Sequence, residues 1–234
     1  MLVAVSPESM SDRMAAAARE LQDQVDPVAT VKSAVQLLVE NVQGCDAASI
    51  SLVHGKRRVE TPAASDDVAA TGDRLQQELS EGPALDTLWD EESVYVPDLP
   101  RDPRWPNWGP RLTEATGARS VLTFRLFTIK DIIGALSMYS TQADAFSAED
   151  KAEGLALAAH IAIAVIAAQK LDRYETALDS RTVIAQACGI VMERYDVDAV
   201  RAFALLTRLS STHNVKIRDI AAELVLTRNI PKTG

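Results

Sequence analysis

Hydrophobic residues recur at helical spacing near the end of the chain, between residues 180 and 222. They fall into three groups, separated by polar breaks at residues 196–198 and 212–214. The groups are Ile184, Ala187, Ile190 and Val191, then Val200, Phe203, Leu206 and Leu209, then Ile217, Ile220, Ala221 and Leu224. Apolar residues three and four positions apart share one face of an α-helix. The pattern therefore predicts three short amphipathic helices that close a small bundle around a common core.

In the preceding part of the chain, the spacing of hydrophobic residues is typical of helices in some segments and of strands in others. A helix is expected from Pro27 to Gly44, with its buried face formed by Val28, Val31, Val35, Leu38 and Val42. Strands are expected at residues 47–54, 57–65, 94–96, 120–127 and 132–140, and helices at 75–79, at 84–89 and from about Pro110. The first two strands would pair through a turn at 54–56, with Ile50 and Leu52 on one face and serines on the other. This order predicts an α+β fold, an antiparallel sheet flanked by helices.

A long connector helix is predicted to begin at Ser147, which would cap it together with Asp150. Positions four and three apart then form a heptad seam, which comprises Leu157, Ile161, Ala164, Ala168, Leu171, Glu175, Leu178, Thr182 and Ala185. One interpretation is that this helix packs only against its own sheet. Its continuation from one domain into the next favours a homodimer held by the connector, at about residues 150–193.

Charge is distributed unevenly along the chain. The formal net charge is -9, which argues against a protein whose whole surface binds nucleic acid. Residues 1–170 hold 15 basic and 25 acidic residues, whereas the chain from Leu171 onward holds 9 and 8. Three cations of this second part, Arg181, Lys216 and Arg218, are expected where the first and third bundle helices begin. Any contact with nucleic acid is therefore expected there, and the alternative is that these cations are solvated or form salt bridges, for instance with Asp179 or Asp219.

Two cysteines, Cys45 and Cys188, each lie in an apolar run, so buried free thiols are expected instead of a disulfide framework. No run of 18 apolar residues occurs, and the N-terminus does not show the pattern of a secretory signal. We therefore expect a cytoplasmic protein that does not contact a membrane.

The sequence offers little catalytic chemistry. Its three histidines, His54, His160 and His213, fall in separate elements without cysteine, histidine or carboxylate partners at ligand spacing. Neither G-x-x-x-x-G-K-[ST] nor G-x-G-x-x-G occurs, and no nucleophile is accompanied by a base and an orienting group. We expect no metal, no cofactor and no enzymatic activity.

Aromatic residues near a proline-rich loop form the candidate ligand site of the N-terminal part. They are Trp89, Trp105, Trp108 and Tyr139. Planar apolar side chains can form the concave wall that small ligands use, and Arg119 could bind an anionic group there. The alternatives are ordinary packing of the loop on the core and an ion pair between Arg119 and a surface acid.

The C-terminal stretch resembles the ANTAR domain, the RNA-binding module of bacterial transcription antitermination regulators. The resemblance rests on Ser180-Arg181, Ile184, residues 186–192, Ala202-Phe203, Leu206 and residues 214–221. It implies RNA binding, to paired hairpins in nascent leader transcripts, through Arg181, Gln186, Ala187, Cys188, Lys216 and Arg218. Cys188 stands where the family usually has lysine. This departure keeps open an alternative, a dimeric sensor that acts by protein contact without binding RNA.

Four segments of the N-terminal part resemble the GAF sensor domain as bacterial GAF–ANTAR regulators carry it. They span residues 80–106, 117–127, 132–140 and 145–164. The resemblance implies an unknown small-molecule ligand, which is not expected to be a cyclic nucleotide because Lys151 follows Asp150 where that class has glutamate. The predicted organisation is a tail or helix at 1–24, a GAF domain at 25–168 and an ANTAR domain at 169–234.

Overall fold

The computed structural model describes residues 26–54, 58–89, 91–128 and 132–229, together with Ala16, Arg19 and Leu21. The chain divides into two compact units, Met1–Gln169 and Lys170–Gly234. Of the predicted tail or helix at 1–24, only those three residues are described. All three are helical, and Leu21 is buried in the core of the first unit. The predicted turn at 54–56 lies outside the described residues from Gly55 onward.

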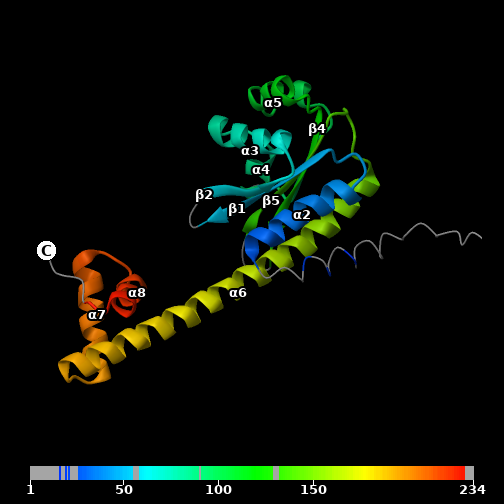
Figure 1. The fold of residues 1–234 in the computed structure, drawn as a ribbon. Helices are drawn as coiled ribbons and strands as arrows, with labels where there is room; N and C mark the ends of the chain where they lie inside the picture. Colours follow the sequence, from blue (N-terminus) through cyan, green and yellow to red (C-terminus); the bar gives the residue numbers. More distant parts are fainter. Residues whose placement is uncertain are drawn as a thin grey trace, which may run out of the picture. The chain divides into compact units, whose positions relative to one another are not determined.

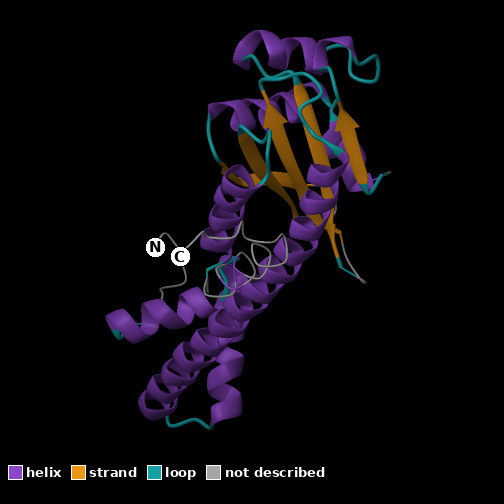
Figure 2. Cartoon of the chain, turned by 90° about the vertical axis from the view of Figure 1, so that its right-hand side faces the viewer, coloured by secondary structure: helices purple, strands orange, loops and turns teal. Residues whose placement is uncertain are grey.

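The first unit is built on an antiparallel sheet of five strands with helices on both sides (Figures 1 and 2). The strands are β1 (Ala47–His54), β2 (Arg58–Ala64), β3 (Ser93–Val96), β4 (Ser120–Phe127) and β5 (Ile132–Ser140). They lie in the order β2-β1-β5-β4-β3, so that β5 occupies the centre. The expected α+β fold is confirmed.

One face of the sheet packs against α2 (Pro27–Asn41) and the first part of α6 (Ala148–Tyr195). Alternate strand residues such as Ile50 and Met138 meet Val31 and Leu38 of α2 there. Val28 was also expected on the buried face of α2, but its side chain is 45% exposed. It lies in the first turn of the helix.

The opposite face lies under α3 (Asp67–Leu79), α4 (Pro83–Trp89) and α5 (Trp108–Thr116), with a short 3-10 turn, η1 (Leu99–Arg101), beside them. This face carries hydroxyl side chains, and the serines of β1 are fully covered: Ser49 and Ser51 are 1% and 4% exposed. Strict alternation of apolar and polar residues is typical of a strand with one wet face. Here both faces are buried, and the polar one becomes an internal layer.

The long helix α6 runs without a break from Ala148 to Tyr195. Ser147 and Asp150 cap it as predicted, because the backbone N–H of Ser147 donates to Asp150 and the N–H of Asp150 donates to Ser147 Oγ. The predicted dimer seam is wrong in its first half, since Leu157, Ile161 and Ala168 are buried in the core of their own unit. Leu171 and Leu178 remain exposed, at 42% and 61%.

The second unit contains the end of α6 together with α7 (Ala199–His213) and α8 (Ile217–Thr227). Its core holds Ala187, Val191, Leu206, Ile220 and Leu224, all from the apolar groups that the sequence singles out. Asp198 caps α7 by accepting from the N–H of Arg201. The three-helix bundle is as expected, and its first helix is the end of α6, in line with the connector predicted at about residues 150–193.

By length and composition α6 is the one described helix that could cross a membrane. Its apolar residues from Leu157 to Val165 include five that are buried against the sheet and α2, at 2% exposure or less. Core packing in the first unit thus accounts for this apolar segment.

Candidate ligand and nucleic-acid sites

A buried polar cluster lies between α3 and the sheet. We call it the Asp73 cluster, and it comprises Ser49, Ser51, Thr61, Asp73, Gln76 and Tyr139. Asp73 is 3% exposed and points from α3 onto β1, β2 and β5. Ser51 Oγ and Thr61 Oγ1 each lie 2.9 Å from Asp73 Oδ2, and Tyr139 Oη lies 3.0 Å from Oδ1. No lysine or arginine forms an ion pair with Asp73 in the described chain.

The hydrogens of this cluster can be counted. Ser51 Oγ and Thr61 Oγ1 are 2.8 Å apart, so these two oxygens and Asp73 Oδ2 are in mutual contact. Three contacts need three hydrogens, and the two hydroxyls supply only two. A protonated Asp73 supplies the third. Burial acts in the same direction, because it raises the pKa of the Asp73 carboxyl and outweighs the hydrogen bonds that lower it.

Ser49 adds an unsatisfied group to the cluster. Its Oγ is the one buried hydroxyl that makes no hydrogen bond of good geometry in the described part of the chain, although it lies close enough to Asp73 to help lower the pKa of that carboxyl. Buried polar atoms are normally paired, so an orphan marks a position where a polar ligand atom would be stabilised. The Asp73 cluster is therefore the candidate ligand site of the first unit.

The predicted aromatic wall belongs mostly to the core. Trp105, Trp108 and Tyr139 lie in one buried cluster, with the two indole rings 6.0 Å apart and edge to face. Trp108 is fully buried and donates its Nε1–H to the carbonyl of Gly72 at 3.0 Å. These contacts match the alternative of loop-to-core packing. Only Tyr139 also reaches the Asp73 cluster, while Trp89 is 43% exposed and lies outside the buried aromatic group.

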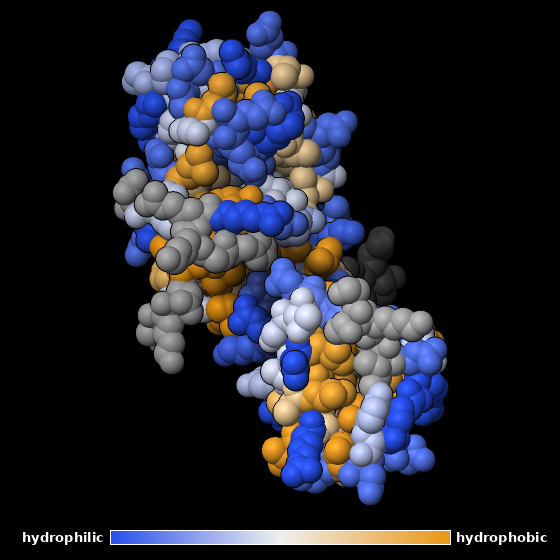
Figure 3. Space-filling view, turned by 90° about the vertical axis from the view of Figure 1, so that its left-hand side faces the viewer, coloured by the Kyte–Doolittle hydropathy of each residue, from blue (hydrophilic) through white to orange (hydrophobic). Residues whose placement is uncertain are grey.

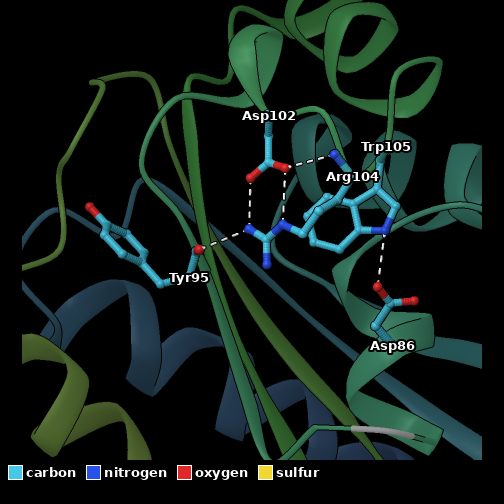
Figure 4. A network of polar contacts seen from close by, with 5 residues as sticks. All are labelled: Asp86, Tyr95, Asp102, Arg104 and Trp105. Atoms are coloured by element: carbon cyan, nitrogen blue, oxygen red, sulfur yellow. Dashed lines mark hydrogen bonds and ion pairs between the residues drawn. The ribbon is translucent and has the colours of Figure 1, made fainter.

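Arg104 holds the loop that carries Trp105 (Figure 4). Its guanidinium donates to both carboxylate oxygens of Asp102, at 2.9 and 2.6 Å, and to the carbonyl of Tyr95 at 3.2 Å. It also lies 4.4 Å from the centre of the Trp105 ring, whose Nε1–H donates to Asp86 at 3.1 Å. The hydrogen bonds from Arg104 lower the pKa of Asp102. The network fixes the loop to β3 and α4, which gives these residues a structural role.

Arg119 does not reach the Asp73 cluster. Its guanidinium donates to Asp98 at 2.8 Å, with the two side chains 40% and 19% exposed. This is the ion pair expected as the alternative to anion binding.

In the second unit, the predicted basic residues Arg181, Lys216 and Arg218 are all exposed. Arg181 lies well inside α6, so the expectation that it begins a helix is wrong. Lys216 precedes α8, and Arg218 Nε lies 3.3 Å from its neighbour Asp219.

The three other predicted RNA-binding positions face different ways. Ala187 is fully buried in the bundle core, so its side chain is not available to RNA in this unit. Cys188 is half-buried against that core, and burial raises the pKa of its thiol. Gln186 is exposed, but five residues of α-helix place it about 140° around the axis from Arg181.

Gln186 instead shares a groove with Arg194 of α6 and Arg228 at the end of α8. Sequence reasoning missed both arginines because neither stands in the motif that carries the resemblance. It also missed Asp73, which lies before the helix expected at residues 75–79. The serines at alternate positions of β1 were a usable signal, since a buried polar face needs a polar partner.

Comparison with known proteins gives two matched segments. Residues 24–165 match the GAF domain family, and residues 172–225 match the ANTAR domain family. No curated protein matches the chain.

Several solved structures share the fold of the first unit. The chain is similar to the GAF domain of a phosphoenolpyruvate-protein phosphotransferase from Coxiella burnetii, with 20% identity and a TM-score of 0.56 over 69% of this chain and 95% of that one. It is also similar to the free methionine-R-sulfoxide reductase of Neisseria meningitidis, solved with its substrate, at 16% identity and a TM-score of 0.51 over 72% and 98%. The phytochrome photosensory core module of Stigmatella aurantiaca covers 90% of this chain, with 46% of its own length, 14% identity and a TM-score of 0.57. At such identities the likeness concerns the fold alone.

Proposed function

Because the chain belongs to the GAF domain family and carries an ANTAR domain in its C-terminal part, we propose that it is a ligand-responsive, RNA-binding regulator of transcription antitermination. ANTAR domains bind RNA and GAF domains sense ligands. In the proposed mechanism, the second unit binds paired hairpins in a nascent leader transcript and prevents a terminator from forming. The observation that carries the proposal is α6, which contributes Leu157 to the sensor core and Ala187 to the core of the RNA-binding unit.

Contacts at the start of α6 support communication between the sensor and this helix. Tyr95 of β3 donates its hydroxyl to Asp144 at 2.8 Å, and Lys151 of α6 lies 3.8 Å from the centre of the Tyr95 ring. The carbonyl of Tyr95 in turn accepts from Arg104. A ligand that shifts the loop around Arg104 would therefore change the contacts of α6 through Tyr95. For such a shift, the ligand needs only to bind one arrangement of the loop more tightly than the other.

The ligand is proposed to bind at the Asp73 cluster in place of the aromatic wall. The hydroxyls of Ser49, Ser51 and Tyr139 fit a small, uncharged polar molecule, since an anion would meet a carboxyl without a nearby cation. We propose no catalytic step and no cofactor, because hydroxyls around a neutral carboxyl do not form a nucleophile with its base.

The chain is proposed to act as a cytoplasmic homodimer. The apolar side chains on α6 beyond the sensor core, Leu171, Tyr174 and Leu178, are 42%, 68% and 61% exposed. Burying them against a second copy would remove this surface from water. A dimer would also make the engagement of a second hairpin intramolecular.

Crosslinking of protein to RNA in the cells of origin tests this function. Ultraviolet crosslinking followed by sequencing should place the protein on hairpins upstream of terminators in leader transcripts. A variant with Arg181, Lys216 and Arg218 all changed to Ala should lose that enrichment. Crosslinks spread evenly over transcripts, or equal for both proteins, would contradict the proposal.

A second candidate is a sensor dimer that acts by protein contact. Figure 3 shows apolar side chains beside hydrophilic ones on the second unit. Val200 and Phe203 of α7 are 79% and 49% exposed. Exposed apolar side chains of this kind would bind a protein as readily as they would pair with a second copy. The crosslinking experiment separates the candidates, because only the first predicts RNA.

A further inference from the structure

A groove of about 620 Å³ lies between the end of α6 and the end of α8. Its lining comes from residues three or four apart on α6 and from two positions at the end of α8. These residues are Gln186, Gly189, Ile190, Glu193, Arg194, Val225 and Arg228. Sites for small ligands usually measure about 300–1,000 Å³. The groove is therefore large enough for one nucleotide.

The groove combines a small apolar floor with polar groups of several kinds. Ile190 and Val225 are half-buried and pack against the bundle core, so they form the apolar part. Gly189 leaves the α6 wall of the groove without a side chain, and a Cβ built there would point into open space, with no atom within 4 Å. Two aliphatic side chains offer enough apolar surface to contact one ring. They are too few for a stable protein interface, in which each partner buries about 800 Å² of surface.

The polar groups of the groove are free to bind. In the part of the chain that the structure describes, the side chains of Gln186, Arg194 and Arg228 have no hydrogen bond or ion pair. This contrasts with Arg201 and Arg218, which lie beside Asp198 and Asp219. Arg228 ends α8 with φ at 59°, a conformation that few residues other than glycine adopt.

We propose that this groove holds one unpaired base of the bound RNA, which rests on the function proposed above. Gln186 and Glu193 would hydrogen-bond to the base edge, and the ring would lie on Ile190 and Val225. The guanidinium groups of Arg194 and Arg228 would contact the adjoining phosphate or stack on the ring. RNA recognition commonly uses splayed bases that are stacked and read at their edges in this way.

The mixture of charges favours a base over an isolated phosphate. Glu193 would repel an anion, but it accepts hydrogen bonds from the exocyclic amino group of a base. The carbonyls at the end of α8 also disfavour a bare anion, because a helix C-terminus carries partial negative charge. A nucleotide satisfies both kinds of group, with its base at Glu193 and its phosphate at the arginines.

The test uses the full chain and hairpin RNAs selected from a pool with a randomised loop. Affinity is measured for the wild type and for Gly189→Leu, Arg194→Ala and Arg228→Ala, with Arg208→Ala as the matched control. Arg208 is an exposed arginine of α7 that has no ion pair among the described residues and does not line the groove. Each groove variant should lose about 5- to 150-fold in affinity, the range for one specific contact, whereas Arg208→Ala should lose much less.

Gly189→Leu separates binding from folding. Leucine has a higher helix propensity than glycine and meets open space, so the variant should be at least as stable as the wild type in thermal unfolding. Each loop base is then removed in turn to leave an abasic site. One abasic position should weaken binding of the wild type and have no further effect on Gly189→Leu, because the groove is already filled.

The outcomes separate the two levels of the proposal. If the wild type binds RNA and the groove variants bind equally well, the groove is not the base site, while the RNA-binding function stands. If the wild type enriches no RNA from the pool, the function itself is wrong and the groove proposal falls with it.

Discussion

Tyr139 Oη lies 3.0 Å from Asp73 Oδ1 in a layer where neither side chain is more than 3% exposed. The bond joins β5, at the centre of the sheet, to α3. Burial raises the pKa of both groups, and the contacts of Ser51 and Thr61 with Asp73 need a hydrogen that a protonated carboxyl can supply. The polar centre of the sensor is thus a hydrogen-bonded network without a compensating cation.

Asp73 should give the sensor a distinctive dependence on pH. The native protein holds the Asp73 proton to higher pH than the unfolded chain, in which the pKa is near 3.8. Unfolding then releases a proton, so the contribution of Asp73 to the free energy of unfolding falls as pH rises above that value through its raised native pKa. In Asp73→Asn this fall should disappear. Asp73→Ala should cost about 1–3 kcal/mol, since it leaves buried hydroxyls unpaired.

Urea unfolding followed by tryptophan fluorescence measures this, because all three tryptophans belong to the first unit. The difference between wild type and Asp73→Asn isolates the effect. Hydrogen bonds lower the pKa values of Asp46 and Asp102, so these two groups contribute with the opposite sign in both proteins. Parallel pH profiles for the two proteins would show that Asp73 is ionised in the native state.

Gly72 should not tolerate even alanine. A Cβ at this position would lie 2.7 Å from Tyr139 Oη and 2.8 Å from its ring carbon Cζ. Although alanine has the higher helix propensity, the overlap should destabilise the sensor by about 1–3 kcal/mol in the same unfolding assay. Adding Tyr139→Phe removes the nearest atom, so the double variant should lose less than the sum of the single variants. Strict additivity would contradict the close contact.

Dimer formation should depend on the exposed part of α6. Changing Leu171 and Leu178 together to Asp should give a folded monomer, because charges in a helical seam would lose their hydration. Light scattering at micromolar concentration measures the mass. As a control, Leu155→Asp alters a 50% exposed residue outside the predicted seam and should leave the dimer intact. A monomeric wild type would refute the seam.

The strands could be predicted closely from the sequence. The bounds of β1, β4 and β5 were predicted to the residue, since clear alternation ends at glycine or polar turns. The start of α3 was missed by eight residues. The helix begins at Asp67, where Asp66 caps it by accepting from two backbone N–H groups, whereas the apolar pattern becomes visible only at Leu75.

Burial was harder to predict than secondary structure. The serines of β1 appeared to face water, and only the packing of α3 covers them. The heptad pattern in α6 did not distinguish contact with its own sheet from contact with a second copy of the chain. Both contacts bury side chains at the same spacing along the helix. The groove of the second unit depends on the approach of α8 to α6, which brings together residues about 40 positions apart, such as Gln186 and Val225.

The salt dependence of RNA binding tests the central claim most directly. The affinity of the full chain for a selected hairpin RNA is measured at several salt concentrations, for the wild type and for Arg181→Ala, Lys216→Ala and Arg218→Ala. We predict that the logarithm of the affinity falls linearly with the logarithm of the salt concentration. Each contact of a lysine or arginine with phosphate should make this slope steeper by about 0.7–0.9. Lys216→Ala should mainly reduce the slope by about one, and Arg218→Ala should weaken binding by about 1–3 kcal/mol. No binding by the wild type at low salt, or unchanged affinities and slopes in all three variants, would contradict the account.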